Sequence, residues 1–248
     1  MLRKDQEDWL RYWIVPLGKK RPLNIGGEEG EKTRKRRFRI NLSSGFEEPA
    51  LNLSTLQRKG FHVLEEKSDL RRRLLEKRLS LNRKDVWIRS DDIKRSLIKL
   101  KSFQEARCIA LYYPIKNEVG TQGIFKIAKE LGKGIYFPLV DGSSLEFRKI
   151  NNLAELKIGR FDVPEPSHCS PGVEIEDIDL IIIPGIAFNS FGVRIGYGKG
   201  YYDRAISKID IKKRVGLAYN FQVVESIPIE RYDVRVGLIV TETGVIIC

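Results

Sequence analysis

The chain has 248 residues, 42% of them hydrophobic, and this length allows one globular domain or two small ones with a substantial buried core. Its formal net charge is +12, but residues 1–62 hold 14 Lys or Arg against 8 Asp or Glu, so half of the excess lies in a quarter of the chain. Three cysteines without CxxC spacing, only two histidines, and no apolar run near the roughly 20 residues of a membrane span exclude a cysteine-rich zinc site and a membrane-spanning role.

Residues 1–62 predict a basic, mobile extension rather than a folded unit. The glycine-rich residues 26–30 precede the basic run at 32–37, and no apolar period is sustained. The segment is too acidic for an organelle transit peptide and lacks the apolar core of a secretory signal. We therefore expect the folded domain at residues 63–248. Because Met1 is the only methionine, we also hypothesise that the real start is a non-AUG codon at Val63 or Leu64.

Two helices are expected at the start of this domain. The leucines between 70 and 81 recur at helical spacing among basic residues, and this helix carries Lys67 and Arg71 one turn apart on the same face. A second helix is predicted to begin at Ser90 as its N-cap, since two aspartates follow in the first turn, and to run through Leu97.

Strands and helices then alternate along the chain. The patterns predict strands at 108–113 and 134–138, an edge strand at 145–149, and strands at 214–219 and 236–240, with helices at 121–131 and 200–209. Residues 180–183 are continuously apolar, which is typical of a central parallel strand buried on both faces. The order of elements predicts a three-layer α/β/α domain, with helices on both sides of a mostly parallel central sheet.

The most informative segment follows the strand at 180–183. Gly196, Gly198 and Gly200 alternate with other residues, and Arg194 and Lys199 bring positive charge to the same place. Glycines let backbone N–H groups approach a ligand closely, so we expect a phosphate-binding loop beyond the carboxyl end of the strand. The spacing fits neither a P-loop nor a dinucleotide-binding fingerprint, which argues against a standard NTPase or dehydrogenase.

The residues around this segment resemble the 5-formyltetrahydrofolate cyclo-ligase family, also called methenyltetrahydrofolate synthetases. The resemblance spans about residues 64–248. It is carried by Pro184-Gly185, Ala187-Phe188, Gly192, Arg194 and residues 196–204, and by four further groups: Lys67, Arg71 and Arg78; Glu118 and Thr121; Glu165-Pro166; and Gln222, Pro228 and Asp233. It implies a fold similar to the NagB/RpiA/CoA-transferase-like fold and an ATP-dependent conversion of 5-formyltetrahydrofolate to 5,10-methenyltetrahydrofolate, with release of ADP and phosphate.

The same resemblance implies roles for individual residues. Lys199 and Arg194 are the expected catalytic residues, which stabilise the charge of the transferred phosphoryl group. The expected ATP-binding residues are Lys67, Arg71, Arg194, Gly196, Tyr197, Gly198, Lys199, Gly200, Tyr201 and Tyr202. The expected folate-binding residues are Tyr113, Glu118 and Phe161. The expected Mg²⁺ ligands are Asp203 and Asp233.

We expect ATP and Mg²⁺ as cofactors and 5-formyltetrahydrofolate, with or without a polyglutamate tail, as the small-molecule substrate. The domain is expected to be a cytoplasmic monomer without membrane or nucleic-acid partners, and unpaired cysteines fit a reducing compartment. Two alternatives stay open. One is a family paralogue that activates a different substrate with ATP. The other is a basic nucleic-acid-binding protein, favoured by the cluster at 34–39 and a pI near 9.6.

Overall fold

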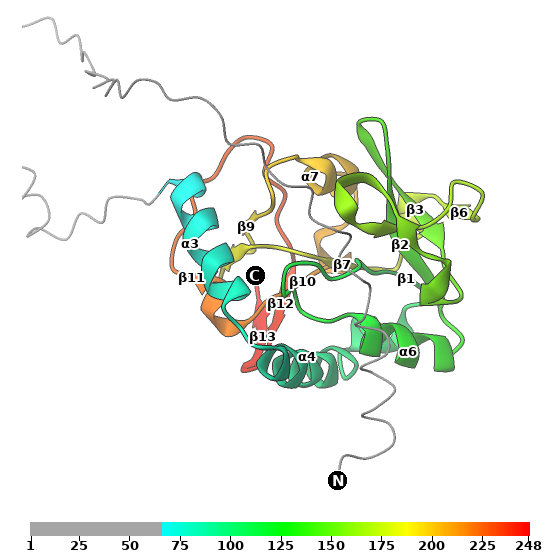
Figure 1. Cartoon of the computed structure of the whole chain (residues 1–248), viewed down its shortest axis with the longest axis horizontal. Helices are drawn as coiled ribbons and strands as arrows, with labels where there is room; N and C mark the ends of the chain where they lie inside the picture. Colours follow the sequence, from blue (N-terminus) through cyan, green and yellow to red (C-terminus); the bar gives the residue numbers. More distant parts are fainter. Residues whose placement is uncertain (1–65) are drawn as a thin grey trace, which may run out of the picture. The chain divides into compact units, whose positions relative to one another are not determined.

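The computed structural model describes residues 66–248, so the predicted extension and the hypothesised start lie outside the described residues. Its centre is an eight-stranded sheet in the order β13-β12-β10-β7-β1-β2-β3-β6 (Figure 1). The five strands from β12 to β2 run parallel to their neighbours, while β13, β3 and β6 add antiparallel edges. The strands are β1 (Cys108–Ala110), β2 (Gly134–Asp141), β3 (Ser144–Lys149), β6 (Gly172–Val173), β7 (Leu180–Ile183), β10 (Arg214–Leu217), β12 (Leu238–Thr241) and β13 (Gly244–Ile247). The predicted mostly parallel sheet is confirmed.

Strand β7 is the central strand that its apolar run predicted. All four of its residues are buried, and it lies between β1 and β10 in parallel register, with Ile109 opposite Leu180 and Val215 opposite Ile182. A strand buried on both faces needs apolar side chains at every position, not only at alternate ones. This is why the run at 180–183 identified the middle of the sheet.

One face of the sheet is covered by three helices, α4 (Arg83–Leu97), α5 (Lys101–Glu105) and α6 (Gln122–Glu130), of which α4 and α6 lie side by side below the sheet in Figure 1. The predicted start of α4 at Ser90 is wrong. The helix begins at Arg83, seven residues before Ser90. Its N-cap is Asn82, whose side chain accepts a hydrogen bond from the N–H of Asp85. Ser90 is instead buried in mid-helix, and its hydroxyl accepts a hydrogen bond from Gly120.

The opposite face carries a layer that is only partly helical. Helix α7 (Tyr201–Ile206) packs there through Ile206, together with Phe188 of a small sheet. That sheet contains β11 (Val223–Val224), β8 (Ala187–Asn189) and β9 (Arg194–Ile195) in this order. Helix α3 (Lys67–Leu79) buries Leu70 and Leu74 against the small sheet, which confirms the predicted first helix. The second layer therefore mixes helices with a small sheet.

The remaining elements are short. Strands β4 (Lys157–Ile158) and β5 (Pro164–Glu165) form a two-stranded pair. Single 3₁₀ turns are η1 (Leu153–Glu155), η2 (Arg160–Asp162), η3 (Ile175–Asp177), η4 (Ile211–Lys213) and η5 (Asn220–Gln222). Most predicted elements have the right type, but their ends differ: the strand predicted at 134–138 extends to Asp141 because it pairs along its length with β3. Within residues 66–248, the helices are too short or too polar to cross a bilayer.

Candidate functional site

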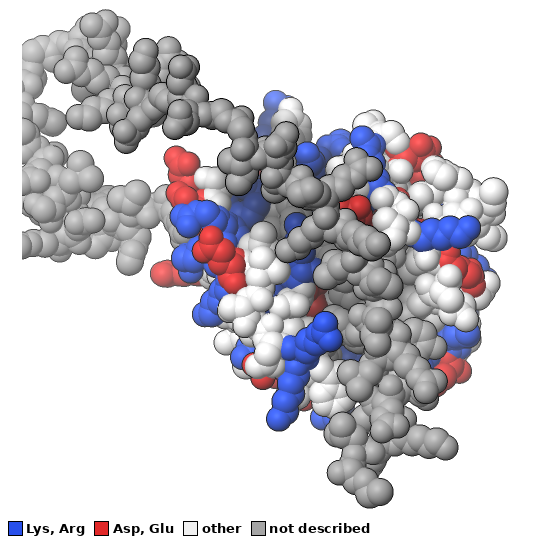
Figure 2. Space-filling model, in the orientation of Figure 1, with Lys and Arg blue, Asp and Glu red and all other residues white. Residues whose placement is uncertain are grey.

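A cleft of about 1700 Å³ lies at the carboxyl ends of the parallel strands. Tyr112 and Tyr113 follow β1 and line it on one side, and Pro184 and Gly185 follow β7 and line it on the other. This is the edge of an open α/β sheet at which ligands bind. Every residue that the sequence predicted for catalysis, ATP binding, folate binding or metal binding lines this one cleft. Figure 2 shows Lys and Arg side chains gathered between α3 and α7, with some acidic side chains among them over α3.

The glycine-rich segment accommodates guanidinium groups at each of its three glycines. A Cβ atom on Gly196 would lie 2.9 Å from Nη1 of Arg194, and one on Gly200 would lie 2.8 Å from Nη1 of Arg204. A Cβ on Gly198 would lie 3.7 Å from Nη2 of Arg71. Gly200 also has a φ of 68°, which an L side chain adopts only with strain. The alternating glycines thus let three arginines pack directly against the loop backbone.

Arg194 lies in β9 beneath this loop, and its side chain is 4% exposed. Its Nη2 donates a hydrogen bond of 2.8 Å to Oδ1 of Asp203, and its guanidinium lies over the ring of Tyr202. Burial raises the pKa of the Tyr202 phenol, which therefore stays neutral. Among the described residues, Nε of Arg194 is buried without a hydrogen-bond partner. A buried donor of this kind is satisfied when an anionic oxygen enters the cleft.

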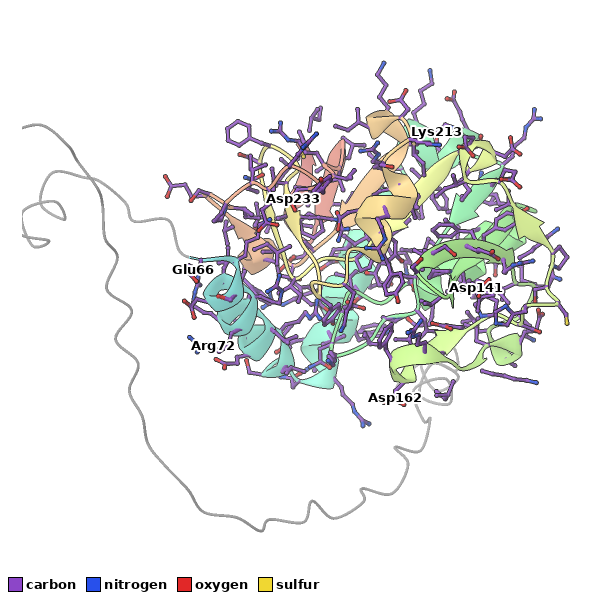
Figure 3. The ribbon with its side chains drawn as sticks, turned by 90° about the horizontal axis from the view of Figure 1, so that it is seen from above. Glu66, Arg72, Asp141, Asp162, Lys213 and Asp233 are labelled. Atoms are coloured by element: carbon purple, nitrogen blue, oxygen red, sulfur yellow. The ribbon has the colours of Figure 1, made fainter. Side chains whose placement is uncertain are left out.

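A second ion pair joins the start of α3 to the loop before β12. Nζ of Lys67 lies 2.5 Å from Oδ2 of Asp233 and 3.3 Å from Glu230. One turn later, Nε of Arg71 donates to the carbonyl oxygen of Gly196 at 2.9 Å. Figure 3 shows Glu66, the residue before α3, on the same side of the molecule as Asp233. Helix α3 therefore presents both of its predicted phosphate-binding cations to the cleft, but each already has a protein partner.

The two predicted metal ligands, Asp203 and Asp233, pair with different cations in the structure. Residues 66–248 contain no group of three or more His, Cys, Asp or Glu side chains arranged to hold a metal ion. Mg²⁺ commonly uses one or two protein carboxylates together with substrate phosphates and waters, so carboxylate oxygens at a phosphate site suit its chemistry. The metal role of the two aspartates stays a prediction.

Lys199 and Phe161 lie at the mouth of the cleft. The ammonium group of Lys199 is 5.9 Å from the centre of the Phe161 ring, and it has no hydrogen-bond or ion-pair partner in the described part of the chain. The Phe161 ring is 6.0 Å from that of Tyr201, and its residue is 52% exposed. Phe161 also has a φ of 63°, a conformation that a bulky residue adopts only where its surroundings impose it. Lys199 is thus the least constrained predicted cation of the cleft.

Glu118 is a buried carboxylate of the cleft, with a hydrogen bond of 3.0 Å from the N–H of Ile115 to Oε2. Burial raises the pKa of its carboxyl, while the neighbouring Arg78, the Ile115 N–H and the Tyr197 hydroxyl act in the opposite direction. The hydroxyl of Tyr197 lies 3.2 Å from Oε1. Tyr113 lies nearby in the chain and is half-buried, and burial raises the pKa of its phenol. The two predicted folate-binding residues Tyr113 and Glu118 therefore lie on the β1 side of the cleft.

Sequence reasoning assigned no role to Arg78 or Arg204, although both approach the cleft. The guanidinium of Arg204 donates to the carbonyl oxygens of Lys199 and Ser143 and so links the glycine-rich segment to the β2–β3 turn. Arg78 is 1% exposed and lies 3.6 Å from Glu118. The sequence carried a signal for it, since Arg78 follows Lys67 and Arg71 at a spacing that keeps all three near one helix face.

A mostly parallel α/β sheet with a cleft beyond its strand ends is the architecture of an α/β enzyme. Residues 63–242 match the sequence profile described as the 5-formyltetrahydrofolate cyclo-ligase family. The chain belongs to the 5-formyltetrahydrofolate cyclo-ligase family, and its enzyme class is that of an ATP-dependent ligase.

Individual relatives agree with this assignment. The chain is 29% identical over 200 residues to a probable 5-formyltetrahydrofolate cyclo-ligase of Caenorhabditis elegans, covering 75% of this chain and 97% of that protein. It is 34% identical to the 5-formyltetrahydrofolate cyclo-ligase of Mycoplasma genitalium, with 64% and 88% covered. The solved structure of the 5,10-methenyltetrahydrofolate synthetase of Aquifex aeolicus superimposes with a TM-score of 0.67 at 36% identity, with 73% of this chain and 92% of that chain covered.

Proposed function

We propose that the protein converts 5-formyltetrahydrofolate to 5,10-methenyltetrahydrofolate with hydrolysis of ATP to ADP and phosphate. The observation that carries the proposal is the cleft that gathers the glycine-rich segment, the four predicted cations and the buried carboxylate of Glu118. Family membership supplies the reaction, and the cleft offers a cationic region for phosphates beside a more apolar region for a pterin. The two substrates, ATP and the folate, can therefore bind side by side in one cleft.

The reaction consists of two displacements. The formyl oxygen attacks the γ-phosphorus of ATP, the bond to the β-phosphate oxygen breaks, and ADP leaves. N10 of the folate then attacks the activated formyl carbon, the carbon–oxygen bond breaks with loss of phosphate, and the N10 proton passes to solvent. Phosphoryl transfer needs alignment and charge neutralisation more than a protein nucleophile. A cleft lined by several cations suits this chemistry.

At the phosphate end, we assign Lys199 and Arg194 to the transferred phosphoryl group. The ammonium group of Lys199 and Nε of Arg194 have no hydrogen-bond partner within residues 66–248, so both donors are available to an incoming oxyanion. The other proposed ATP-binding residues are Lys67, Arg71, Gly196, Tyr197, Gly198, Gly200, Tyr201 and Tyr202, all of which line the cleft. Helix α7 has only six residues, so positive potential at this end comes mainly from side chains rather than from the helix dipole.

Asp203 and Asp233 are the residues that we propose for Mg²⁺. When bound, the ion would neutralise phosphate charge and help to align the phosphate chain. In the structure these carboxylates bind Arg194 and Lys67 instead. They therefore hold two phosphate-binding cations in place until phosphate oxygens replace them as partners.

At the folate end, we propose Tyr113, Glu118 and Phe161 as substrate-binding residues. Glu118 offers a carboxylate to the N–H groups of a pterin, and its buried position strengthens such a hydrogen bond. Phe161 offers an exposed ring at the mouth of the cleft on which an aromatic group can stack. Tyr113 lies directly after β1 and adds an aromatic wall.

The experiment that tests the function is a turnover assay. Purified full-length protein is mixed with ATP, Mg²⁺ and 5-formyltetrahydrofolate, and the methenyl product is followed by its absorbance while ADP is measured separately. We expect both products in equal amounts, and neither without ATP. ADP formation without methenyl product, or no turnover at all, contradicts the proposal. The first of these results identifies a paralogue that activates another substrate.

The finer fold assignment, location and assembly are also proposals. The parallel sheet supports the NagB/RpiA/CoA-transferase-like fold. Three unpaired cysteines support a reducing compartment, for which we propose the cytoplasm. We propose that the enzyme is a monomer because one chain supplies every residue of the cleft, and that it accepts folates with or without a polyglutamate tail.

A further inference from the structure

Arg78 is a charged residue buried at the end of α3, where it is only 1% exposed. Nε donates to the carbonyl oxygen of Lys116 at 3.0 Å, and Nη1 donates to that of Gly185 at 3.1 Å. Nη2 donates to the hydroxyl of Tyr197 at 2.6 Å and lies 3.6 Å from Oε1 of Glu118. A buried guanidinium is costly unless its donors are satisfied, and these partners come from three segments that border the cleft: the turn at residues 115–118, the residues after β7 and the glycine-rich segment.

A chain of hydrogen bonds joins Arg78 to Glu118 through Tyr197. The Tyr197 oxygen accepts from Arg78, so its single hydrogen is available to Oε1 of Glu118 at 3.2 Å. Oε2 of the same carboxylate accepts from Ile115. Both oxygens of Glu118 are therefore fixed from the protein side, and its orientation depends on the position of Arg78 and Tyr197.

The turn that carries Glu118 is also attached to the end of α3. Lys116 and Asn117 have φ values of 48° and 57°, which non-glycine residues adopt only when their surroundings impose it. The side-chain amide of Asn117 donates to the carbonyl oxygens of Arg78 and Leu79 at the end of α3 and of Leu81, two residues beyond it. In return, Arg78 donates to the carbonyl oxygen of Lys116. The strained turn and the helix end thus satisfy each other's polar groups.

We propose that Arg78 is a positioning residue that orients Glu118 and Tyr197 together and keeps Glu118 ionised for folate binding. The same helix carries Lys67 and Arg71 at the phosphate end, so α3 connects the two ends of the cleft. This role rests on the proposed function, because it assumes that Glu118 contacts the folate. The geometry of Arg78 itself does not depend on that assumption.

Glu118 is surrounded by two cations and several phenols. Burial raises the pKa of its carboxyl, and Arg78 is the nearest cation acting against burial. Loss of Arg78 should therefore raise this pKa further. The titratable or charged groups that face Glu118 are Arg78 of α3, Lys116 of its own turn, Tyr112 after β1, Tyr197 and Tyr202 of the glycine-rich region, and Tyr219 after β10.

The first test is a titration of Glu118 in the full-length, ligand-free protein. Glutamate labelled with ¹³C at the side-chain carboxyl is followed by NMR, and Glu118→Gln identifies the resonance. In Arg78→Gln we expect the pKa of Glu118 to rise by about one unit or more, because the opposite charge is lost. Arg78→Lys keeps the charge and should restore most of the wild-type value. An unchanged pKa of Glu118 in Arg78→Gln overturns the proposal.

Arg214→Gln is the matched control for loss of a buried arginine. Arg214 is also buried and donates to backbone carbonyl oxygens, at 3.0 Å to Arg235 and 3.2 Å to Ser207. Its loss should lower stability but leave the pKa of Glu118 unchanged. If Arg78→Gln does not fold, Tyr197→Phe provides the second variant. It removes the hydroxyl that bonds to Glu118, so we expect a smaller rise in the same pKa, and no rise overturns the proposal.

The second test measures binding of 5-formyltetrahydrofolate by calorimetry between pH 5 and 9, without ATP. In Arg78→Gln we expect weaker binding at neutral pH and partial recovery as pH rises, since Glu118 ionises at higher pH than in the wild type. An equal loss at every pH assigns Arg78 a structural role and overturns the proposal. If wild-type protein does not bind this folate, the proposed function fails, while the NMR titration still decides the role of Arg78.

Discussion

At the scale of single residues, the cleft cations differ in how firmly the protein holds them. Lys67 and Arg194 are in ion pairs with Asp233 and Asp203, whereas the ammonium group of Lys199 contacts only the ring of Phe161 among the described residues. A cation without a protein partner can bind a phosphate oxygen without first breaking an ion pair. This difference supports the choice of Lys199 as the residue that stabilises the transferred phosphoryl group.

Lys199→Ala should therefore reduce turnover strongly and stability little. We expect kcat to fall by about 10²–10³-fold, as for removal of one donor to a developing oxyanion. The thermal unfolding midpoint should stay near that of the wild type because the side chain is exposed. Lys208→Ala is the matched control, since Lys208 is also exposed but does not line the cleft. Near-normal turnover of Lys199→Ala would falsify the assigned role.

Gly200→Ala separates backbone strain from loss of the site. Gly200 and Gly132 have φ values of 68° and 70°, so alanine at either position should cost about 1 kcal/mol of stability. Only at Gly200 would the new Cβ meet a side chain of the cleft, at 2.8 Å from Nη1 of Arg204. We expect similar shifts in urea unfolding for both variants but a loss of ATP affinity for Gly200→Ala alone. Equal ATP affinity in the two variants would contradict the proposed loop role.

At the scale of elements, the parallel strands are connected by side chains as well as by their backbone ladder. The carboxylate of Asp179, just before β7, accepts from the N–H groups of Arg107 and Cys108 at 2.8 and 2.9 Å. Burial alone would raise its pKa, but these hydrogen bonds together with the charges of Lys213 and Arg107 outweigh burial, and the pKa is lowered. Asp179 therefore fixes the register of β7 against β1 at the end of the sheet opposite the cleft.

The sign of the pH dependence follows from this lowered pKa. A carboxyl with a lower pKa in the folded state stabilises above its unfolded value, near pH 3.9, and the stabilisation is lost as pH falls through the folded value. We expect Asp179→Asn to lower the free energy of unfolding by about 1 kcal/mol at pH 7. Urea unfolding should show this difference shrinking below about pH 4. A difference that is constant from pH 7 to pH 3 would argue against the ionised form as the stabilising species.

Two elements show how local signals compete. Ser90 with two following aspartates has the pattern of an N-cap, but Asn82 performs this function eight residues earlier. The hydroxyl of Ser90 instead accepts a hydrogen bond from the N–H of Gly120 and so joins α4 to the segment before α6. The predicted strand at 108–113 ends at Ala110 because the following residues turn into the cleft, where Tyr112 and Tyr113 line the wall. Cap and strand patterns are local, whereas these outcomes depend on distant partners.

At the scale of the whole molecule, the proposed site lies within residues 67–233 and the family match within 63–242. Both begin after the basic segment that holds half of the chain's excess positive charge. The cations that line the cleft come from α3, the turn after β1, β9, the glycine-rich segment, α7 and the loop before β12. The net charge of +12 is therefore a poor guide to the ligand, because half of the excess positive charge lies in residues 1–62, outside the region that matches the family.

Removal of residues 1–62 should leave kcat and both KM values unchanged, because no proposed site residue precedes Lys67. The turnover assay on full-length and shortened protein measures this directly. A large loss of activity would show that the first 62 residues contribute to catalysis or substrate binding.

If the protein were a nucleic-acid binder, deletion of residues 1–62 should abolish nucleic-acid binding. N-terminal sequencing of protein from native cells tests the hypothesised start at Val63 or Leu64.

The sequence by itself determined the class of fold and the central strand at 180–183, because these features depend on local pattern such as a continuous apolar run. Local pattern also indicated the glycine-rich segment and the shared helix face of Lys67 and Arg71, whereas the resemblance to the family supplied the other expected site residues. Only the tertiary structure decided the partners of those residues. Arg78 donates to Gly185, 107 positions away, and Lys67 to Asp233, 166 positions away. No local pattern specifies such pairs, since burial and partner choice arise when distant segments pack together.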